Sequence, residues 1–292
     1  MTEKGIFYMQ KPPRVLTIAG SAAGGSAGIQ ADLKTFQELD VYGMSAITAI
    51  VARHPVTTKN VHMQTIESIE AQFRTAFDQI GVDALKLGML FSTPIIKTVA
   101  ILLEQVTDQA IVVDPVMIGK LKSKLLKNDA IDILKRKILP LATIMTPNME
   151  EASLLLNGRI LESVDDLKQA AIDIHEQGFN HVLVKGGRLQ GPAVDVLYDG
   201  QQLTTYTAPR IDTTNTSGAG CTYSAAITAH LAKGKSVREA VYAAKCFVTT
   251  AIAHGFSYTG IAGPTDHAAQ RKHGKAYDVI VEESPVHKCD DS

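Results

Sequence analysis

The 292-residue sequence has no tryptophan, few aromatic residues and no excess of charge of either sign. Aromatic residues make up only 5% of the chain, which argues against a base-stacking surface for nucleic acid. Lysine and arginine total 29, aspartate and glutamate total 30, and the formal net charge is −1 with neutral histidine. A near-neutral chain gives no electrostatic reason to expect nucleic acid or an anionic membrane as the main partner.

Long apolar runs and paired cysteines are also missing. No apolar run approaches the ~18 residues of a membrane span, and residues 1–10 lack the apolar stretch of a secretion signal. The three cysteines, at 221, 246 and 289, cannot form a disulfide framework and lack the spacing of a zinc site. We therefore expect a reduced, cytoplasmic setting.

The order of apolar patterns predicts an α/β fold. Strand-like segments alternate with helical patterns, and no repeat or low-complexity linker divides the chain. We expect one domain over residues 1–292, with tails at 1–13 and about 283–292. Such alternation favours a mostly parallel central sheet with helices on both faces, and ligands then bind at the carboxyl ends of the strands. Strands are expected over 14–19, 44–51, 83–87, 110–113, 142–145 and 181–184, and a hairpin over 195–207.

Helical patterns fill the intervals between these strands. They cover residues 29–39, 69–80, 94–106, 130–139, 164–177, 218–233 and 236–254. A small-residue loop, Gly20 to Gly28, joins the first strand to the first helix. A segment that nearly matches a phosphate-binding P-loop, residues 229–236, lacks the first glycine and follows a helix rather than a strand. We therefore interpret Gly234 as a helix C-cap residue.

The strongest local motif is the run from Asn215 to Cys221, which precedes a helix of small residues. Gly218 and Gly220 would let backbone approach a ligand closely, and the helix would point free N–H groups at it. Such a turn is an anion hole suited to phosphate. Cys221 falls in the first helical turn, where the helix dipole favours a thiolate. A tight structural loop with a core cysteine is the alternative interpretation.

Three further strand ends carry charged or amide side chains. Asp114 follows one strand, Asn148 and Glu151 follow the next, and Lys185 follows a third. Each has a simpler explanation, since Asn148 and Glu151 also fit a helix N-cap and its capping-box partner. Together at one sheet edge they match phosphoryl transfer, which needs hard oxygens for Mg²⁺ and cations for the phosphates.

In this order, the motifs resemble the ribokinase-like superfamily, in particular its branch of pyridoxal (vitamin B6) kinases and hydroxymethylpyrimidine (phosphate) kinases. The resemblance spans about residues 14 to 282. The segments that carry it are Leu16–Ser21, Ala27–Phe36, Tyr42–Ala49, Lys86–Leu90, Asp114–Met117, Thr146–Asn148 with Glu151, Lys185–Gly187 and Gly218–Thr222.

The resemblance implies a ribokinase-like three-layer fold and an ATP- and Mg²⁺-dependent kinase, usually a homodimer, that phosphorylates a ring hydroxymethyl group. Cys221 matches the catalytic base beside the anion hole of Gly218, Ala219 and Gly220. The other implied roles are metal organisation by Asp114 and Glu151, nucleotide contact by Asn148 and Lys185, and a ring pocket lined by Ser21, Asp32, Met89 and Val116.

The departures from the family pattern concern the ring. Ala22 replaces an aspartate, Ser217 stands where histidine is common, Arg53 replaces a glutamate or glutamine of pyrimidine kinases, and Gly119 replaces a second cysteine of dual-substrate pyridoxal kinases. Because Arg53 cannot accept a hydrogen bond from a ring amino group, the resemblance favours a B6-vitamer kinase. The alternatives are a hydroxymethylpyrimidine or phosphomethylpyrimidine kinase of thiamine biosynthesis and a nucleotide-binding protein without turnover.

Overall fold

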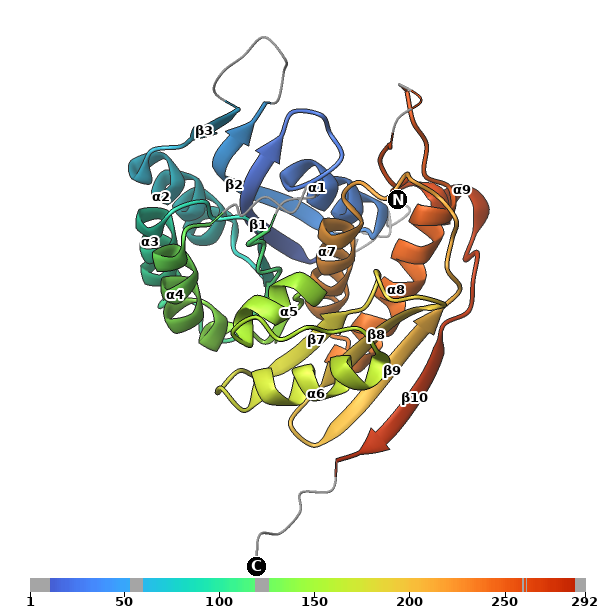
Figure 1. Cartoon of the computed structure of the whole chain (residues 1–292). Helices are drawn as coiled ribbons and strands as arrows, with labels where there is room; N and C mark the ends of the chain where they lie inside the picture. Colours follow the sequence, from blue (N-terminus) through green and yellow to red (C-terminus); the bar gives the residue numbers. More distant parts are fainter. Residues whose placement is uncertain (1–10, 53–59, 119–125, 259, 261, 287–292) are drawn as a thin grey trace, which may run out of the picture.

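The computed structural model describes residues 11–52, 60–118, 126–258, 260 and 262–286. Its strands form one ten-stranded sheet in the order β10-β9-β8-β7-β6-β5-β4-β1-β2-β3 (Figure 1). The six strands from β7 to β2 are parallel, while β3 at one edge and β8, β9 and β10 at the other are antiparallel. The strands are β1 (Arg14–Ala22), β2 (Tyr42–Val51), β3 (Val61–Met63), β4 (Ala84–Leu87), β5 (Ala110–Val113), β6 (Ile144–Met145), β7 (His181–Lys185), β8 (Ala193–Tyr198), β9 (Gln202–Ala208) and β10 (Ile280–Pro285).

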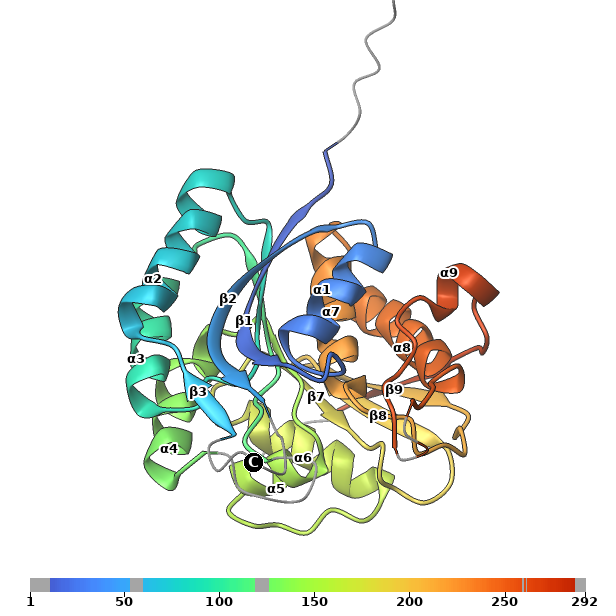
Figure 2. The same cartoon turned by 90° about the horizontal axis from the view of Figure 1, so that it is seen from above.

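Helices cover both faces of this sheet, as the resemblance implies. One core packs α2 to α6 against one face, and the other packs α1, α7 and α8 against the opposite face (Figures 1 and 2). The helices are α1 (Ile29–Glu38), α2 (Ile66–Arg74), α3 (Thr93–Leu103), α4 (Asn128–Lys137), α5 (Met149–Leu155), α6 (Val164–His175), α7 (Ala219–Ala232), α8 (Val237–Ala253) and α9 (Ala269–His273). The prediction of a three-layer α/β fold is confirmed.

Alternation along the strands divides the residues between the two cores. In β1, Leu16 and Ile18 face the α2–α6 side, whereas Val15 faces the α1, α7 and α8 side. On that second side, α7 packs against β1, β4 and β5 at the centre of the sheet. Every residue from Thr222 to His230 is buried, which explains why this helix is built from small side chains on all its faces.

Several predicted boundaries need correction. The helix expected over 69–80 begins at Ile66 and changes to a π-helical segment, Thr75–Ile80. β1 continues to Ala22, so the loop begins later than Gly20. β10 pairs with β9 as far as Pro285, so residues 283–285 are not part of the C-terminal tail. The elements β3, α5 and α9 are missing from the prediction because each is too short to give a clear period.

The near P-loop segment has the structure expected of a helix end. Lys233 is the C-cap residue of α7, and Gly234 has a φ of 81°. The next helix begins with Ser236 as its N-cap, whose hydroxyl accepts from the Glu239 N–H. This segment therefore joins two helices, as predicted, and no strand leads into it. In the described residues, no helix is both long enough and apolar enough to cross a bilayer.

Candidate active site

Two strand ends bring opposite charges together at the carboxyl edge of the sheet. Asp114 follows β5, and Lys185 is the last residue of β7. The Lys185 Nζ donates to the Asp114 Oδ1 at 2.8 Å, and Asp114 is only 3% exposed. Burial opposes the charged carboxylate, but the ammonium groups of Lys185 and Lys86 hold the pKa of Asp114 below its usual value. The site therefore favours an ionised carboxylate at Asp114, beside the partly buried ammonium group of Lys185.

Asn148 and Glu151 form the capping box that the sequence allowed. The Asn148 Oδ1 accepts from the N–H groups of Glu150 and Glu151, and the Asn148 N–H donates to the Glu151 Oε2 at 2.9 Å. The capping interpretation is confirmed, but its bonds do not use the Asn148 Nδ2, and Asn148 also lines the cavity described below. Burial raises the pKa of Glu151 to about 8, with Asp114 adding to the rise and Lys185 opposing it.

The carboxyl groups of Asp114 and Glu151 suit a magnesium ion held partly through water. Mg²⁺ prefers carboxylate oxygens, phosphates and retained waters to a closed cage of protein ligands. Burial, with a smaller contribution from Asp114, disfavours the charged form of Glu151, and a divalent cation held by the two carboxyl groups would favour it. The donor set therefore fits the ion implied by the resemblance.

The turn that enters α7 has the geometry of an anion hole. Gly218 has a φ of 85°, and a Cβ there would lie 1.6 Å from the Ser26 carbonyl oxygen, so no other residue fits. A Cβ on Gly220 would lie 3.5 Å from the Lys185 Nζ, which places this backbone next to the ammonium. Within the described residues, the amides of Gly220 and Cys221 have no acceptor. Two free N–H groups and a cation thus converge at the N-terminus of a 14-residue helix.

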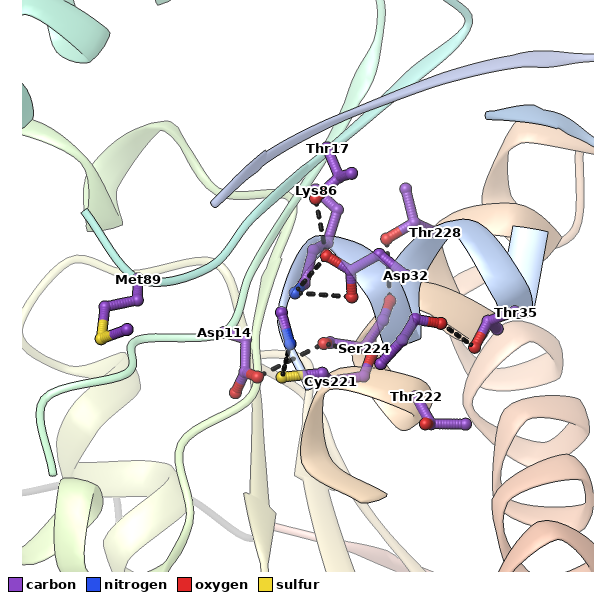
Figure 3. Close-up of polar contacts among 12 residues, drawn as sticks. Thr17, Asp32, Thr35, Lys86, Met89, Asp114, Cys221, Thr222, Ser224 and Thr228 are labelled. Carbon is purple, nitrogen blue, oxygen red and sulfur yellow. Dashed lines mark hydrogen bonds and ion pairs between the residues drawn. The ribbon is translucent and has the colours of Figure 1, made fainter. Parts of the chain in front are cut away.

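Cys221 lies on the inner side of this turn. Its Sγ accepts from the Gly28 N–H at 3.4 Å, and the Ser224 hydroxyl contacts both the Cys221 carbonyl and the Asp114 Oδ2 (Figure 3). Desolvation by the surrounding protein raises the pKa of the thiol, while Lys86 lowers it. The expectation that the helix N-terminus would produce a low-pKa thiolate is therefore wrong, because burial outweighs it.

Sequence reasoning missed a second buried cation, Lys86 of β4. Lys86 and Asp32 are both 0% exposed, and the Lys86 Nζ donates to the two Asp32 oxygens at 3.0 and 2.9 Å (Figure 3). The Thr17 hydroxyl donates to the same carboxylate at 2.7 Å. A lysine within an otherwise apolar strand was the available signal, since such a residue is buried only when paired. Asp32 is thus enclosed by partners within the protein.

The other residues assigned to the ring pocket follow neighbouring strands. Ser21 lies at the end of β1, Met89 follows β4, and Val116 follows β5. The Ser21 hydroxyl accepts from the Gln30 Nε2 at 2.7 Å, and the Met89 carbonyl accepts from the Thr48 hydroxyl at 2.8 Å. Their contact with a ring stays a prediction.

Of the four residues that depart from the family pattern, the structure describes Ala22 and Ser217. Arg53 and Gly119 lie outside the described residues. Ala22 is half-buried at the end of β1, and its N–H donates to the Gln30 Oε1 at 2.9 Å. Ser217 pairs with the hydroxyl of Ser26 at 3.1 Å. Ser217 therefore supports the loop beneath the Gly218 turn.

A cavity of about 370 Å³ opens on the outer side of the Gly218 turn. Four of the predicted site residues, Asn148, Lys185, Ala219 and Gly220, line it. Its floor holds a buried ion pair that the sequence did not indicate, in which the Lys245 Nζ donates to the Asp195 Oδ2 at 2.6 Å. The remaining walls are Met149, Glu150, Gly187, Arg188, Ala193, Pro209, Arg210, Ile211, Thr216, Tyr223, Val248, Thr249 and Ile252. A pocket with a cation and free amides at one end and apolar residues at the other suits a nucleotide.

The sequence matches the phosphomethylpyrimidine kinase family over residues 23–266. The chain belongs to this family. It is 47% identical to a pyridoxine kinase of Bacillus subtilis over 88% of its own length and 97% of the relative's. It is 45% identical to a hydroxymethylpyrimidine/phosphomethylpyrimidine kinase of Streptomyces coelicolor, covering 88% of this chain and 94% of that one.

Solved structures place this phosphomethylpyrimidine kinase family member close to pyridoxal kinases. A Staphylococcus aureus pyridoxal kinase in complex with AMP-PCP and pyridoxal matches with a TM-score of 0.85 and 42% identity, over 94% of this chain and 100% of that one. A Bacillus subtilis pyridoxal kinase in complex with ADP gives a TM-score of 0.84 at 47% identity, over 89% and 99%. The expected resemblance to kinases that phosphorylate a hydroxyl group is therefore confirmed.

Proposed function

We propose that this protein is an ATP- and Mg²⁺-dependent kinase that phosphorylates the hydroxymethyl group of a vitamin B6 vitamer. The observation that carries the proposal is the position of Lys185, which lines a nucleotide-sized cavity beside Ala219 and Gly220 and donates to Asp114. The names of the relatives, which include nucleotide-bound pyridoxal kinases, support it. We also propose a cytoplasmic homodimer, as the resemblance implies.

In this proposal each residue has a separate task. The amides of Gly220 and Cys221 and the ammonium of Lys185 bind phosphate oxygens and stabilise their charge during transfer. Asp114 and Glu151 would hold Mg²⁺ and its waters, and a bound ion would add charge neutralisation at the phosphates. Asn148 uses its side-chain amide as a donor to the nucleotide.

Cys221 is the proposed base for the substrate hydroxyl. Burial raises the pKa of this thiol in the free protein. It can accept a proton only when a thiolate forms, and Lys86 and the Gly28 N–H are the groups that favour the thiolate. In a loose phosphoryl-transfer transition state the hydroxyl needs little activation, and the Cys221 thiolate would take up its proton as the bond to phosphorus forms.

The deciding experiment is ADP release with four substrates: pyridoxal, pyridoxine, pyridoxamine and hydroxymethylpyrimidine. We expect the highest kcat/KM with a B6 vitamer, because Arg53 leaves the amino group of the pyrimidine without an acceptor, at a cost of roughly 1–3 kcal/mol. A higher kcat/KM for hydroxymethylpyrimidine would favour the thiamine-biosynthesis alternative, which the Streptomyces coelicolor relative supports. Nucleotide binding without turnover of any of the four would favour the binding protein.

A further inference from the structure

The loop between β7 and β8 forms one wall of the cavity, and its shape depends on a residue outside the loop. Residues 186–192 turn back sharply between the two strands, and Gly187 and Arg188 face the cavity. The segment after β9, from Pro209 to Ile211, lines the adjoining wall. The two walls come from different parts of the chain, so their relative position depends on contacts between residues 186–192 and residues 209–211.

Arg210 provides that connection. Its guanidinium donates four hydrogen bonds, all to backbone carbonyls of the loop: from Nε to Gly191, from Nη1 to Gly187, and from Nη2 to Leu189 and Pro192. The bonds to Gly187 and Leu189 measure 2.9 and 2.6 Å. Carbonyl oxygens that converge in this way repel one another unless a donor or cation lies between them. The described residues place no carboxylate on Arg210, so the carbonyls are its partners within the protein.

Three other contacts hold the loop, at Gly186, at Leu189 and at Arg188, whose guanidinium donates to the Glu150 carboxylate, and none of them binds the carbonyls that Arg210 binds. The Asp195 Oδ1 accepts from the Gly186 N–H at 3.0 Å where the loop begins. The Leu189 side chain is buried, and its N–H donates to the Gly186 carbonyl. Apart from Leu189, residues 187–192 are exposed. The carbonyls of this exposed loop therefore depend on Arg210 for a fixed direction.

We propose that Arg210 is a positioning residue for nucleotide binding, which holds the 186–192 loop as a preformed wall of the cavity. The inference rests on the proposed function, since it assumes that the cavity takes ATP. A preformed wall spares the nucleotide the cost of ordering the loop, so its loss weakens binding. A lysine cannot replace Arg210, because one ammonium group cannot span carbonyls that three guanidinium nitrogens reach.

The test compares Arg210→Lys and Arg210→Gln with wild type and with Arg14→Gln. Arg14 is the matched control, because it also donates from three side-chain nitrogens, to Asp83 and to the Ile80 carbonyl. It is the first residue of β1 and lies at the amino ends of the strands, away from the carboxyl ends that form the site. We expect both Arg210 variants to raise the KM for ATP and the Kd for ADP about tenfold, the effect of losing one or two net hydrogen bonds. The KM for the ring substrate and the melting temperature should stay near wild type, as should nucleotide binding by Arg14→Gln.

Hydrogen exchange of the nucleotide-free protein provides a second measurement that does not depend on activity. The N–H groups of residues 186–191 should exchange faster in both Arg210 variants than in wild type, and their exchange should be unchanged in Arg14→Gln. If Arg210→Lys binds ADP normally and its loop exchanges as in wild type, Arg210 acts through its charge and the proposal is wrong. If wild type itself fails to bind ADP, the proposed function fails, while a faster-exchanging loop would still show that Arg210 holds it.

Discussion

The nucleotide side and the ring side of this site each contain a buried lysine–aspartate pair, but the two pairs differ in their access to the site. On the nucleotide side, Lys245 and Asp195 line the cavity, and Asp195 also holds the Gly186 amide. On the ring side, Lys86 bonds both oxygens of Asp32, and both residues are fully buried. The Lys245–Asp195 pair thus forms part of a cavity wall, whereas the Lys86–Asp32 pair is enclosed by the protein.

This difference changes what the family resemblance can say about Asp32. The resemblance assigns Asp32 to the ring pocket, whereas the structure surrounds it with Lys86 and Thr17. Such a residue can act on a substrate through the charge it places near Cys221, because Lys86 lowers and Asp32 raises the pKa of that thiol. An effect of Asp32 on the reaction without contact to the ring requires that Cys221 is the base, so the first prediction concerns Cys221.

Cys221→Ala should have the largest effect, because Cys221 lies between the two sides. We expect kcat to fall by a factor of ~10² to 10⁴, the usual contribution of a positioned base, with the Kd for ADP nearly unchanged. The Gly220 amide and Lys185 remain in place to bind phosphate. Steady-state kinetics and calorimetry with ADP measure the two quantities.

Cys246→Ala is the control for the loss of a thiol. Cys246 is buried in the middle of α8, on the second core, so its loss should reduce stability and leave kcat close to wild type. A Cys221→Ala variant that keeps most of its kcat would mean that transfer needs no base and that Cys221 only packs beneath the anion hole.

The contributions of the Lys86–Asp32 and Lys245–Asp195 pairs to stability can be compared in single variants that remove the lysine and double variants that replace both residues with apolar ones. Lys86→Met and Lys245→Met should each destabilise the protein by about 3–5 kcal/mol, because each leaves a buried carboxylate without its partner. The double variants Lys86→Met/Asp32→Leu and Lys245→Met/Asp195→Leu should recover much of that stability, since a well-packed apolar pair tolerates burial. Urea unfolding measures all four variants.

Activity then separates the two sides. The double variant at 195 and 245 should raise the KM for ATP, because both residues line the cavity and the Gly186 N–H keeps only one of its two acceptors, the Val194 carbonyl. The double variant at 32 and 86 should change kcat instead, through Cys221. If Asp32→Asn raises the KM of the vitamer by more than about tenfold, the equivalent of 1.4 kcal/mol, Asp32 contacts the ring as the resemblance implies.

The sequence predicted the fold and the nucleotide side better than these pairs, for physical reasons. Asp114, Asn148 and Lys185 lie at or just beyond the carboxyl ends of their strands, and parallel strands bring these ends to one edge whatever the details of packing. Lys86 and Lys245 lie inside a strand and a helix, and their partners are 54 and 50 residues away. No local pattern reveals such partners, and the same holds for Arg210 and the loop carbonyls.

The next prediction concerns His267, which contacts Thr222 of α7 and makes the stability of the protein depend on pH. His267 is buried beside Thr222, and burial lowers its pKa from 6.5 to about 4, with Lys34 adding to this and Asp266 and Glu38 opposing it. Because the unfolded chain takes up the proton below pH 6.5 and the folded protein does not, stability falls as the pH drops from 6.5 towards 4. The shift corresponds to at most about 3 kcal/mol.

His267→Gln should therefore flatten the dependence of the unfolding free energy on pH between 6.5 and 4. His230, near the other end of α7, has its pKa lowered to about 4 by burial as well, so part of the slope should persist in this variant. His230→Gln is the matched control and should remove a similar part. An unchanged slope in His267→Gln would mean that His267 is charged in the folded protein and pairs with Asp266 or Glu38.

The smallest expected change tests whether Asn148 is only a helix cap. Asn148→Ala removes the acceptor for the amides of Glu150 and Glu151, and Ser163→Ala removes the equivalent cap of α6. Each should cost about 1 kcal/mol of stability. Only Asn148→Ala should also raise the KM for ATP, since Asn148 lines the cavity and Ser163 does not.

Asn148→Ser separates the two roles of this side chain. Serine is an N-cap of similar strength to asparagine, so α5 should keep its stability. Serine lacks the second, nitrogen-bearing arm of the side chain, so a nucleotide contact through Nδ2 is lost. We expect unfolding in urea close to wild type together with a KM for ATP raised about as much as in Asn148→Ala. If Asn148→Ser binds ATP as tightly as wild type, the capping box is the whole role of Asn148, and the phosphates are held by Lys185 and the amides at the start of α7.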